Sequence, residues 1–266
     1  MTERKIAFFD IDGTLTSEID GSIPSSVYTS IEKARKQGNL MFINTGRCFQ
    51  NVEKRFRDIG FDGYVCGCGT HVLCNDTEIM YHTQSHLITM EILHAARQAR
   101  VDLLFESRDL LAFDLTRDLT HPDAQRHYRN FLKLGYDMPT DFEAPDFHCD
   151  KFVIWYRDEK QLTQFRKTSD LYFDCIDRGG TFREFVPHGY TKATGIQTVL
   201  RYYHMDENNV YAFGDSNNDL AMLQNVKNSV AMGNSSPTTL FDYVSYVTDK
   251  ASQNGIQKAL EHFHFL

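Results

Sequence analysis

Four short segments, far apart along this chain, carry side chains that together suit phosphoryl transfer through an aspartate. The segments are Asp10-Ile11-Asp12-Gly13-Thr14, Ile43-Asn44-Thr45-Gly46-Arg47, Lys192, and Gly214-Asp215-Ser216-Asn217-Asn218-Asp219. Any one of them alone could be a coincidence. In combination they predict an active site, because each supplies a different part of the same chemistry.

The first segment offers two carboxylates. Asp10 and Asp12 directly follow the apolar residues 6–9, and an extended backbone would direct both side chains to the same side. One carboxylate can attack phosphorus and carry the phosphoryl group as an acyl phosphate. The other can protonate the departing alcohol and later deprotonate water. A turn or a helix cap is the alternative interpretation, but the apolar run before the pair and Gly13 after it favour a functional loop.

Two acidic groups would repel a phosphate, so the site needs positive charge. Asp215 also follows an apolar run and can join Asp10 in binding a hard cation, for which Mg²⁺ is well suited. Lys192 can supply a second positive charge to the nucleophile and to the phosphate. Considered alone, Lys192 would be a solvated lysine at the start of a helix.

Four further residues can contact the phosphoryl group or organise the site. The Thr45 hydroxyl and the Gly46 N–H can bind a phosphate oxygen, although a lone Thr-Gly is usually a turn. Asn218 can hydrogen-bond phosphate, and Asp219 can orient Lys192. The alternative for this last segment is a cluster of helix-capping side chains, and both interpretations can hold together.

The apolar runs before these segments predict the strands that position them. Residues 5–9, 40–43 and 210–213 each have the length and composition of a buried strand, and helical patterns separate them. Alternating strands and helices predict an α/β fold with a parallel sheet. In such sheets ligands bind at the carboxyl ends of the strands, which is where the candidate side chains lie.

The middle of the chain predicts a different module. Residues 103–105 and 110–113 predict paired strands, and Pro122 predicts the start of a helix that runs to about residue 134. We therefore expect an inserted α+β domain at residues 83–184, between the second and third segments. Residues 1–82 and 185–266 would form the core.

Composition excludes several classes of protein. The net charge of −8 opposes nucleic-acid binding, because phosphate backbones select basic surfaces. No apolar run reaches the roughly 20 residues of a membrane span. We expect a cytoplasmic protein, since its six cysteines lack the spacing of a disulfide framework. Cys66, Cys68, His71 and Cys74 could be considered for structural zinc, but without paired Cys-x-x-Cys knuckles a buried strand end is favoured.

The four segments resemble the motifs of the haloacid dehalogenase-like hydrolase superfamily, and more narrowly those of its Cof-type phosphatases. The resemblance implies a Rossmann-like core with helices on both faces, an inserted cap of type C2B that selects the substrate, and Mg²⁺-dependent hydrolysis. It implies Asp10 as the nucleophile and Asp12 as the general acid/base. The implied metal ligands are Asp10, the Asp12 backbone carbonyl and Asp215, and the implied phosphate contacts are Thr45, Gly46, Lys192 and Asn218, with Asp219 in support and Arg47 as a further substrate contact.

The expected activity is therefore hydrolysis of small phosphorylated metabolites, with sugar phosphates as the leading class. A phosphotransferase or phosphohexomutase would use the same intermediate, and a regulatory protein that binds such metabolites without turnover is the non-enzymatic alternative. A monomer or weak homodimer is expected. One segment departs from the family pattern, since Cys68-Gly69-Thr70 stands where Asn-Gly-Ala is usual.

Overall fold

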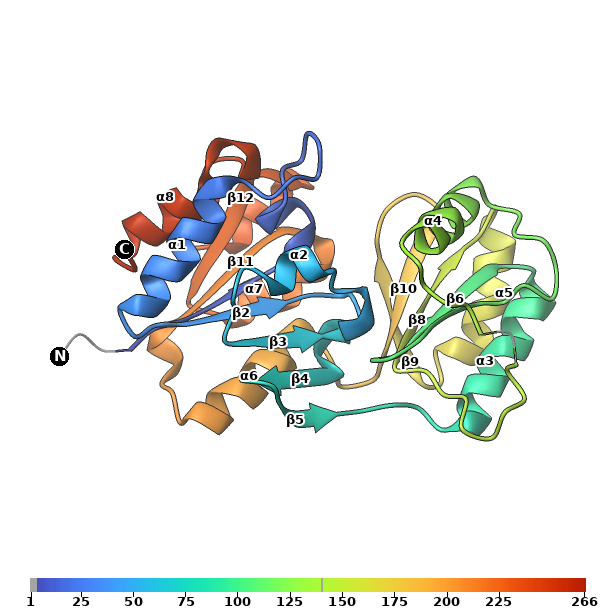
Figure 1. Ribbon diagram of the computed structural model, residues 1–266. Coiled ribbons are helices and arrows are strands. Elements are labelled where there is room, and N and C mark those ends of the chain that lie inside the picture. Colours follow the sequence, from blue (N-terminus) through green and yellow to red (C-terminus); the bar gives the residue numbers. More distant parts are fainter. Residues whose placement is uncertain (1–3, 140) are drawn as a thin grey trace. The chain divides into compact units, whose positions relative to one another are not determined.

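The computed structural model describes residues 4–139 and 141–266, which divide into two compact units (Figure 1). The first unit comprises residues 4–47, Asn51–Tyr81 and Tyr190–Leu266. The second comprises Cys48–Gln50 and His82–Gly189. The functional division expected from the sequence, a core of residues 1–82 and 185–266 and a cap of residues 83–184, stays a prediction.

The first unit is built on an eight-stranded sheet with the order β13-β12-β11-β1-β2-β3-β4-β5. Its strands are β1 (Ile6–Phe9), β2 (Leu40–Asn44), β3 (Gly63–Cys66), β4 (His71–Cys74), β5 (Thr77–Tyr81), β11 (Val210–Ser216), β12 (Asn228–Ser236) and β13 (Tyr246–Val247). The strands from β13 to β3 are parallel, whereas β4 and β5 extend the sheet antiparallel. Phe9 is in register with both Ile43 and Phe213, so the carboxyl ends of the three central strands are level.

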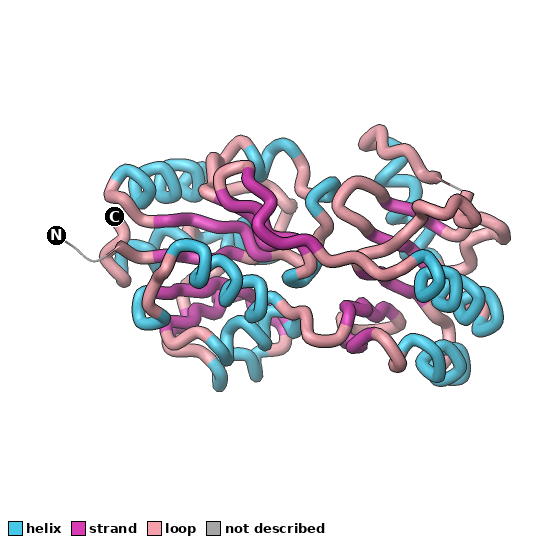
Figure 2. The backbone as a smooth tube through the Cα atoms, turned by 90° about the horizontal axis from the view of Figure 1, so that it is seen from below, coloured by secondary structure: helices cyan, strands magenta, loops and turns pink. Residues whose placement is uncertain are grey.

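Helices cover both faces of this sheet (Figure 2). They are α1 (Ser25–Lys36), α2 (Lys54–Arg57), α6 (Lys192–Tyr203), α7 (Leu220–Asn225) and α8 (Gly255–His262). α1 packs against α8, and α6 packs against α7. Every residue of β1 and β2 is buried, as parallel strands between two helical layers require.

The second unit contains a five-stranded antiparallel sheet with the order β7-β6-β8-β10-β9. Its elements are β6 (Asp102–Glu106), β7 (Leu111–Phe113), β8 (Lys151–Trp155), β9 (Phe173–Asp177), β10 (Phe182–Pro187), α3 (His86–Ala99), α4 (Pro122–Lys133) and α5 (Glu159–Ser169). Residues on one face, such as Phe152, pack with α3 and α5, and residues on the other face, such as Trp155, pack with α4. Alternate residues of one strand therefore serve two separate cores.

This architecture agrees with the predicted fold class, an α/β core with an α+β insertion. The predicted strand pair in the insertion is β6 with β7, and the helix predicted from Pro122 is α4. The sequence-based prediction did not include α3 or the hairpin of β4 and β5. Among the described residues, no helix is both long enough and apolar enough to cross a membrane.

Candidate active site

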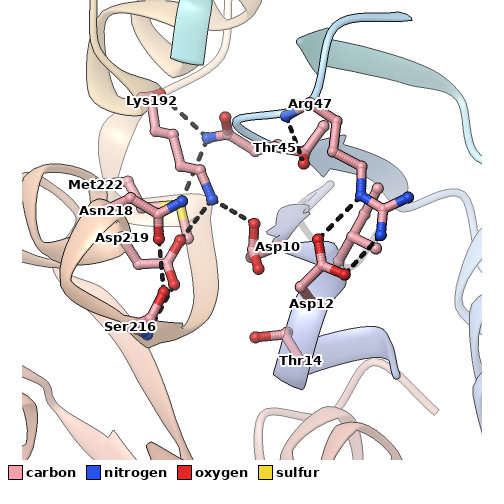
Figure 3. Close-up of polar contacts among 12 residues, drawn as sticks. Asp10, Asp12, Thr14, Thr45, Arg47, Lys192, Ser216, Asn218, Asp219 and Met222 are labelled. Carbon is pink, nitrogen blue, oxygen red and sulfur yellow. Dashed lines mark hydrogen bonds and ion pairs between the residues drawn. The ribbon is translucent and has the colours of Figure 1, made fainter. Parts of the chain in front are cut away.

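The carboxyl edge of the first sheet brings the four segments together (Figure 3). Asp10 follows β1 and its N–H donates to the Phe213 carbonyl of β11, at 3.0 Å. Lys192 is the first residue of α6, whose start is fixed by the side chain of Thr191 in a capping box. The Asn44 side chain, at the end of β2, donates to the Lys192 carbonyl at 3.1 Å and so ties α6 to the sheet.

Lys192 lies between two carboxylates. Its Nζ donates to Oδ1 of Asp10 and, at 2.6 Å, to Oδ1 of Asp219. All three side chains are buried. Burial would lower the pKa of Lys192, but the two carboxylates outweigh burial and hold this pKa above its ordinary value. The lysine is therefore a fixed positive charge at the candidate nucleophile.

Both carboxylate oxygens of Asp219 accept hydrogen bonds from neighbouring groups. Its Oδ2 accepts hydrogen bonds from the backbone N–H groups of Asp215 and Ser216, at 2.9 and 3.0 Å. A Cβ on Gly214 would lie 2.6 Å from the Asp219 Cβ, so only glycine permits this close approach. Asp219 thus positions both Lys192 and the loop that carries Asp215.

Asp10 belongs to a group of carboxylates that could hold a metal ion. Oxygen atoms of Asp10, Asp215 and Asp219 lie within 4.8 Å of one another, the one such group of potential metal ligands in the described part of the chain. Asp219 uses both oxygens for Lys192 and the backbone, which leaves Asp10 and Asp215 as the better ligands. These are the two side chains predicted from the sequence, and a pair of carboxylates completed by carbonyl and water oxygens suits Mg²⁺.

The loop after Asp10 closes on this pair of ligands. Gly13 has φ +81°, and a Cβ there would lie 2.3 Å from Asp215 Oδ2. The Thr14 hydroxyl donates to Asp215 Oδ1 at 3.1 Å, and the Asn234 amide donates to the Gly13 carbonyl at 2.7 Å. The sequence-based prediction named neither Thr14 nor Asn234 as a site residue, although Thr14 joins the loop to Asp215 and Asn234 holds the loop at Gly13.

Burial raises the pKa of Asp10 to about 7 and that of Asp215 to about 8. Lys192 opposes this effect at Asp10, whereas the nearby carboxylates add to it at both residues. The buried Asp10 and the half-buried Asp215 bind protons readily and should also favour a divalent cation, which would replace the protons.

We expect Mg²⁺ to stabilise the protein more at high pH than at low pH. The aspartate pKa in the unfolded chain is about 4, so between about pH 4 and 8 the folded protein binds more protons. In EDTA the free energy of unfolding should therefore fall as the pH rises from about 4 to about 8. Mg²⁺ binds the ionised carboxylates and should restore about 2 to 3 kcal/mol at a hundredfold excess over its dissociation constant.

Thermal unfolding in EDTA and in Mg²⁺, at about pH 5.5 and about pH 8, measures this difference. Asp215→Asn is the control variant, because it removes one ligand and should largely abolish the response to Mg²⁺. An equal rise of the melting temperature at both pH values, or in both proteins, would contradict the assignment.

Asp12 takes a different partner from Asp10. Its carboxylate accepts hydrogen bonds from Nε and Nη2 of Arg47, at 2.9 and 2.6 Å. Asp10 (φ −67°, ψ 165°) and Asp12 (φ −78°, ψ 113°) both have the extended backbone angles expected from the sequence, although the chain enters a short irregular helical turn, Ile11–Leu15, directly after Asp10. Asp12 is 59% exposed, whereas Asp10 is buried.

The remaining predicted residues surround the same edge. Thr45 is buried, its N–H donates to the Val65 carbonyl, and its hydroxyl oxygen accepts from the Arg47 N–H at 3.1 Å. Asn218 is also buried and accepts from the Ser216 hydroxyl at 2.6 Å. The structure thus brings together every predicted site residue, with Gly46 between Thr45 and Arg47. Their contacts with a phosphate stay predictions.

The cysteine-rich segment packs against the start of α6, the helix that carries Lys192. A Cβ on Gly69 would lie 2.3 Å from the Thr191 carbonyl, so the Cys68-Gly69-Thr70 loop packs tightly against the start of α6. Among the described residues, the cysteines of this segment form no disulfide, and His71 pairs with Glu78 at 3.0 Å. Within the described ranges, these side chains do not gather into a group of metal ligands.

Residues 7–260 match the family described as haloacid dehalogenase-like hydrolase. The chain belongs to this family.

Two curated relatives and one solved structure extend the comparison. A Bacillus subtilis (strain 168) protein with the provisional name phosphatase YkrA is 26% identical over 264 residues, 99% of each chain. The 5-amino-6-(5-phospho-D-ribitylamino)uracil phosphatase YitU of the same strain is 23% identical over 292 residues, covering 100% of this chain and 99% of its own. The HAD subclass IIB sugar phosphatase BT4131 superposes with a TM-score of 0.82 at 24% identity, over 98% of this chain and 100% of its own. The predicted family, fold class and enzyme class, a phosphatase, are confirmed.

Proposed function

We propose that this protein is a Mg²⁺-dependent phosphatase that hydrolyses small phosphorylated metabolites through an aspartyl phosphate on Asp10. The observation that carries the proposal is the position of Lys192, whose Nζ joins Asp10 to Asp219 in a buried site with Asp215 alongside. The proposed nucleophile, fixed cation and metal ligands thus lie at one edge of the sheet. The division into a core, residues 1–82 and 185–266, and a substrate-selecting cap, residues 83–184, is part of this proposal.

The proposed reaction has two steps. A carboxylate oxygen of Asp10 forms a bond to phosphorus while the bond to the leaving oxygen breaks, and Asp12 gives that oxygen a proton. Water then attacks phosphorus, Asp12 takes a proton from it, and the Asp10 carboxylate and inorganic phosphate are released. Lys192 offsets the negative charge in both steps. Mg²⁺, held by Asp10, Asp215 and the Asp12 carbonyl, would neutralise and orient the phosphoryl oxygens.

Three residues would hold the transferred group in place. The Thr45 hydroxyl, the Gly46 N–H and the Asn218 amide are the proposed donors to phosphoryl oxygens. Thr45 and Gly46 follow β2, which pairs with the strand that ends before Asp10, and Asn218 precedes Asp219, the partner of Lys192 (Figure 3). Such fixed donors favour the charge distribution of the transition state over that of the free substrate.

The substrate class is inferred from the relatives. YitU is named for a phosphoribityl compound and BT4131 is named a sugar phosphatase. Phosphorylated sugars and sugar alcohols are therefore the first compounds to test. The cytoplasmic location expected from the sequence stays a prediction, which cell fractionation would test. The monomeric or weakly dimeric state also stays a prediction, which light scattering would test.

Release of inorganic phosphate from a panel of sugar phosphates, in Mg²⁺ and in EDTA, tests the function. We expect turnover with Mg²⁺, loss of turnover in EDTA, and recovery when Mg²⁺ is restored in excess. An isomeric sugar phosphate as the main product would instead identify a mutase. Folded protein that binds the panel in Mg²⁺ but releases no phosphate would identify a binding protein and overturn the proposal.

A further inference from the structure

The guanidinium of Arg47 contacts Glu53, Asn51 and Phe56 in addition to Asp12. Its Nη1 donates to Glu53 Oε1 and to the Asn51 carbonyl, each at 3.2 Å. Its Cζ lies 5.3 Å from the centre of the buried Phe56 ring. With the two bonds to Asp12, Arg47 makes four hydrogen bonds and one cation–π contact, and its side chain is only 19% exposed.

Glu53 is itself fixed by a second arginine. Its Oε2 accepts from Nε of Arg55 at 2.8 Å, and its Oε1 accepts from Nη2 at 3.3 Å. Arg55 also donates to the Gly21 carbonyl at 2.7 Å, and its Cζ lies 4.6 Å from the centre of the same Phe56 ring. Burial would raise the pKa of Glu53, but Arg55 and Arg47 outweigh burial and hold it below its ordinary value. We call Glu53, Arg55 and Phe56 the Arg47 brace.

We propose that the Arg47 brace fixes Arg47 against Asp12, which makes Arg47 and Glu53 positioning residues for the acid/base carboxylate. This inference rests on the proposed function. It changes the role expected for Arg47, which the sequence suggested as a contact to the substrate. Four of the five N–H donors of its guanidinium are used within the protein, so a substrate phosphate could take at most one N–H without displacing a bond to Asp12 or to the brace.

Asp12 needs such support more than Asp10 does. Asp10 is buried and held by Lys192, whereas Asp12 is 59% exposed and sits in an irregular turn. Proton transfer requires the carboxylate within hydrogen-bonding reach of the leaving oxygen. The planar fork of arginine fixes the plane of a carboxylate, and the brace in turn fixes the fork. Loss of the brace should therefore slow the chemical step while leaving substrate binding nearly unchanged.

Steady-state kinetics of three variants test the proposal. Glu53→Gln keeps the size of the side chain but loses its charge, and should lower kcat about tenfold, because a displacement of about 1 Å can cost up to a hundredfold. Arg47→Met should lower kcat about a hundredfold, the lower range for losing acid–base catalysis, and Arg47→Lys should recover part of that loss. KM should stay within about threefold in each variant, because none of the substitutions removes a group that binds the substrate in its ground state. Arg35→Met is the matched control, because it removes an Arg–Asp pair with Asp62 in the same unit and should leave kcat unchanged.

Two kinetic outcomes would overturn the brace. A KM that rises more than tenfold in Arg47→Met with kcat unchanged would make Arg47 a substrate ligand. A melting temperature that falls in Glu53→Gln while both constants stay at wild-type values would make the brace purely structural.

A readout that does not need activity separates this inference from the proposed function. The Nε–H resonance of Arg47 should shift in the NMR spectra of both Asp12→Asn and Glu53→Gln. If the wild-type protein releases no phosphate, the proposed function fails, and the brace is then judged on this resonance. An Arg47 resonance that is unchanged in Glu53→Gln would overturn the brace whatever the activity.

Discussion

Asp10→Asn should abolish phosphate release, with a loss of at least about 10⁴-fold in kcat, the scale expected when a covalent nucleophile is removed. The amide has nearly the shape of the carboxylate but cannot form the acyl phosphate. Its oxygen can still accept the hydrogen bond from Lys192, which also keeps Asp219 as a partner. The variant should therefore fold.

Stability distinguishes a missing nucleophile from a damaged protein. Burial raises the pKa of Asp10 to about 7, so its ionised form is unfavourable in the fold above that pH. A neutral asparagine removes this cost, and at about pH 8 the variant should be at least as stable as the wild type. Phosphate assays and thermal unfolding of Asp10→Asn, beside the exposed-site control Asp58→Asn, measure both effects. Wild-type turnover in Asp10→Asn would show that another group attacks phosphorus.

The strand ends could be predicted from the sequence because local composition fixes them. Residues 6–9 and 40–43 are continuous apolar runs, which a strand buried on both faces requires. A polar residue follows each run directly, so the carboxyl end of each strand can be recognised from the sequence. The level register of Phe9, Ile43 and Phe213 then brings the segments to one edge, as the rule for open α/β sheets predicts.

Two elements that the prediction lacked do carry local signals. α3 has the N-cap Ser85, which accepts from the Ile88 N–H, and its buried residues recur at helical spacing. The β4–β5 hairpin turns at Asn75 and Asp76, both with positive φ, which these two residue types tolerate. Periodicity and turn chemistry could have found both elements.

The supporting contacts of the site could not be predicted in this way. Asn234 holds the Gly13 carbonyl across 221 positions of sequence, and Arg47 meets Asp12 across 35. Neither pair has a local pattern, because the sheet edge alone brings the partners together. The sequence accordingly indicated the groups that do the chemistry and one residue that orients them, Asp219, whereas the contacts of Asn234 and Arg47 depended on the three-dimensional fold.

Lys192→Met should be the most destabilising change at this site. The ammonium group lies between Asp10 and Asp219, and all three side chains are buried. Removing one partner from a buried ion pair leaves uncompensated charge and costs about 3 to 5 kcal/mol. Methionine keeps much of the apolar stem, so lost packing adds little. The kcat should also fall, by about 10³-fold, since the lysine stabilises the developing charge.

The size of this destabilisation should depend on pH. Lys192 lowers the pKa of Asp10, so without it the pKa rises further above 7. At about pH 5.5 the Asp10 carboxylate of the variant carries a proton and less charge is left unpaired, whereas at about pH 8 the full cost appears. The difference in the free energy of unfolding between variant and wild type should therefore be larger at the higher pH.

Urea unfolding of Lys192→Met and wild type at the two pH values measures the difference. Lys258→Met is the matched control, because its ion pair with Asp249 is half exposed and should contribute at most about 1 kcal/mol at either pH. If Lys192→Met lost no more stability than Lys258→Met, the lysine would not be the charge that holds two buried carboxylates together. The pH dependence of the destabilisation and the loss of turnover in Lys192→Met should then both be absent, because both follow from the contact of Lys192 with the two carboxylates.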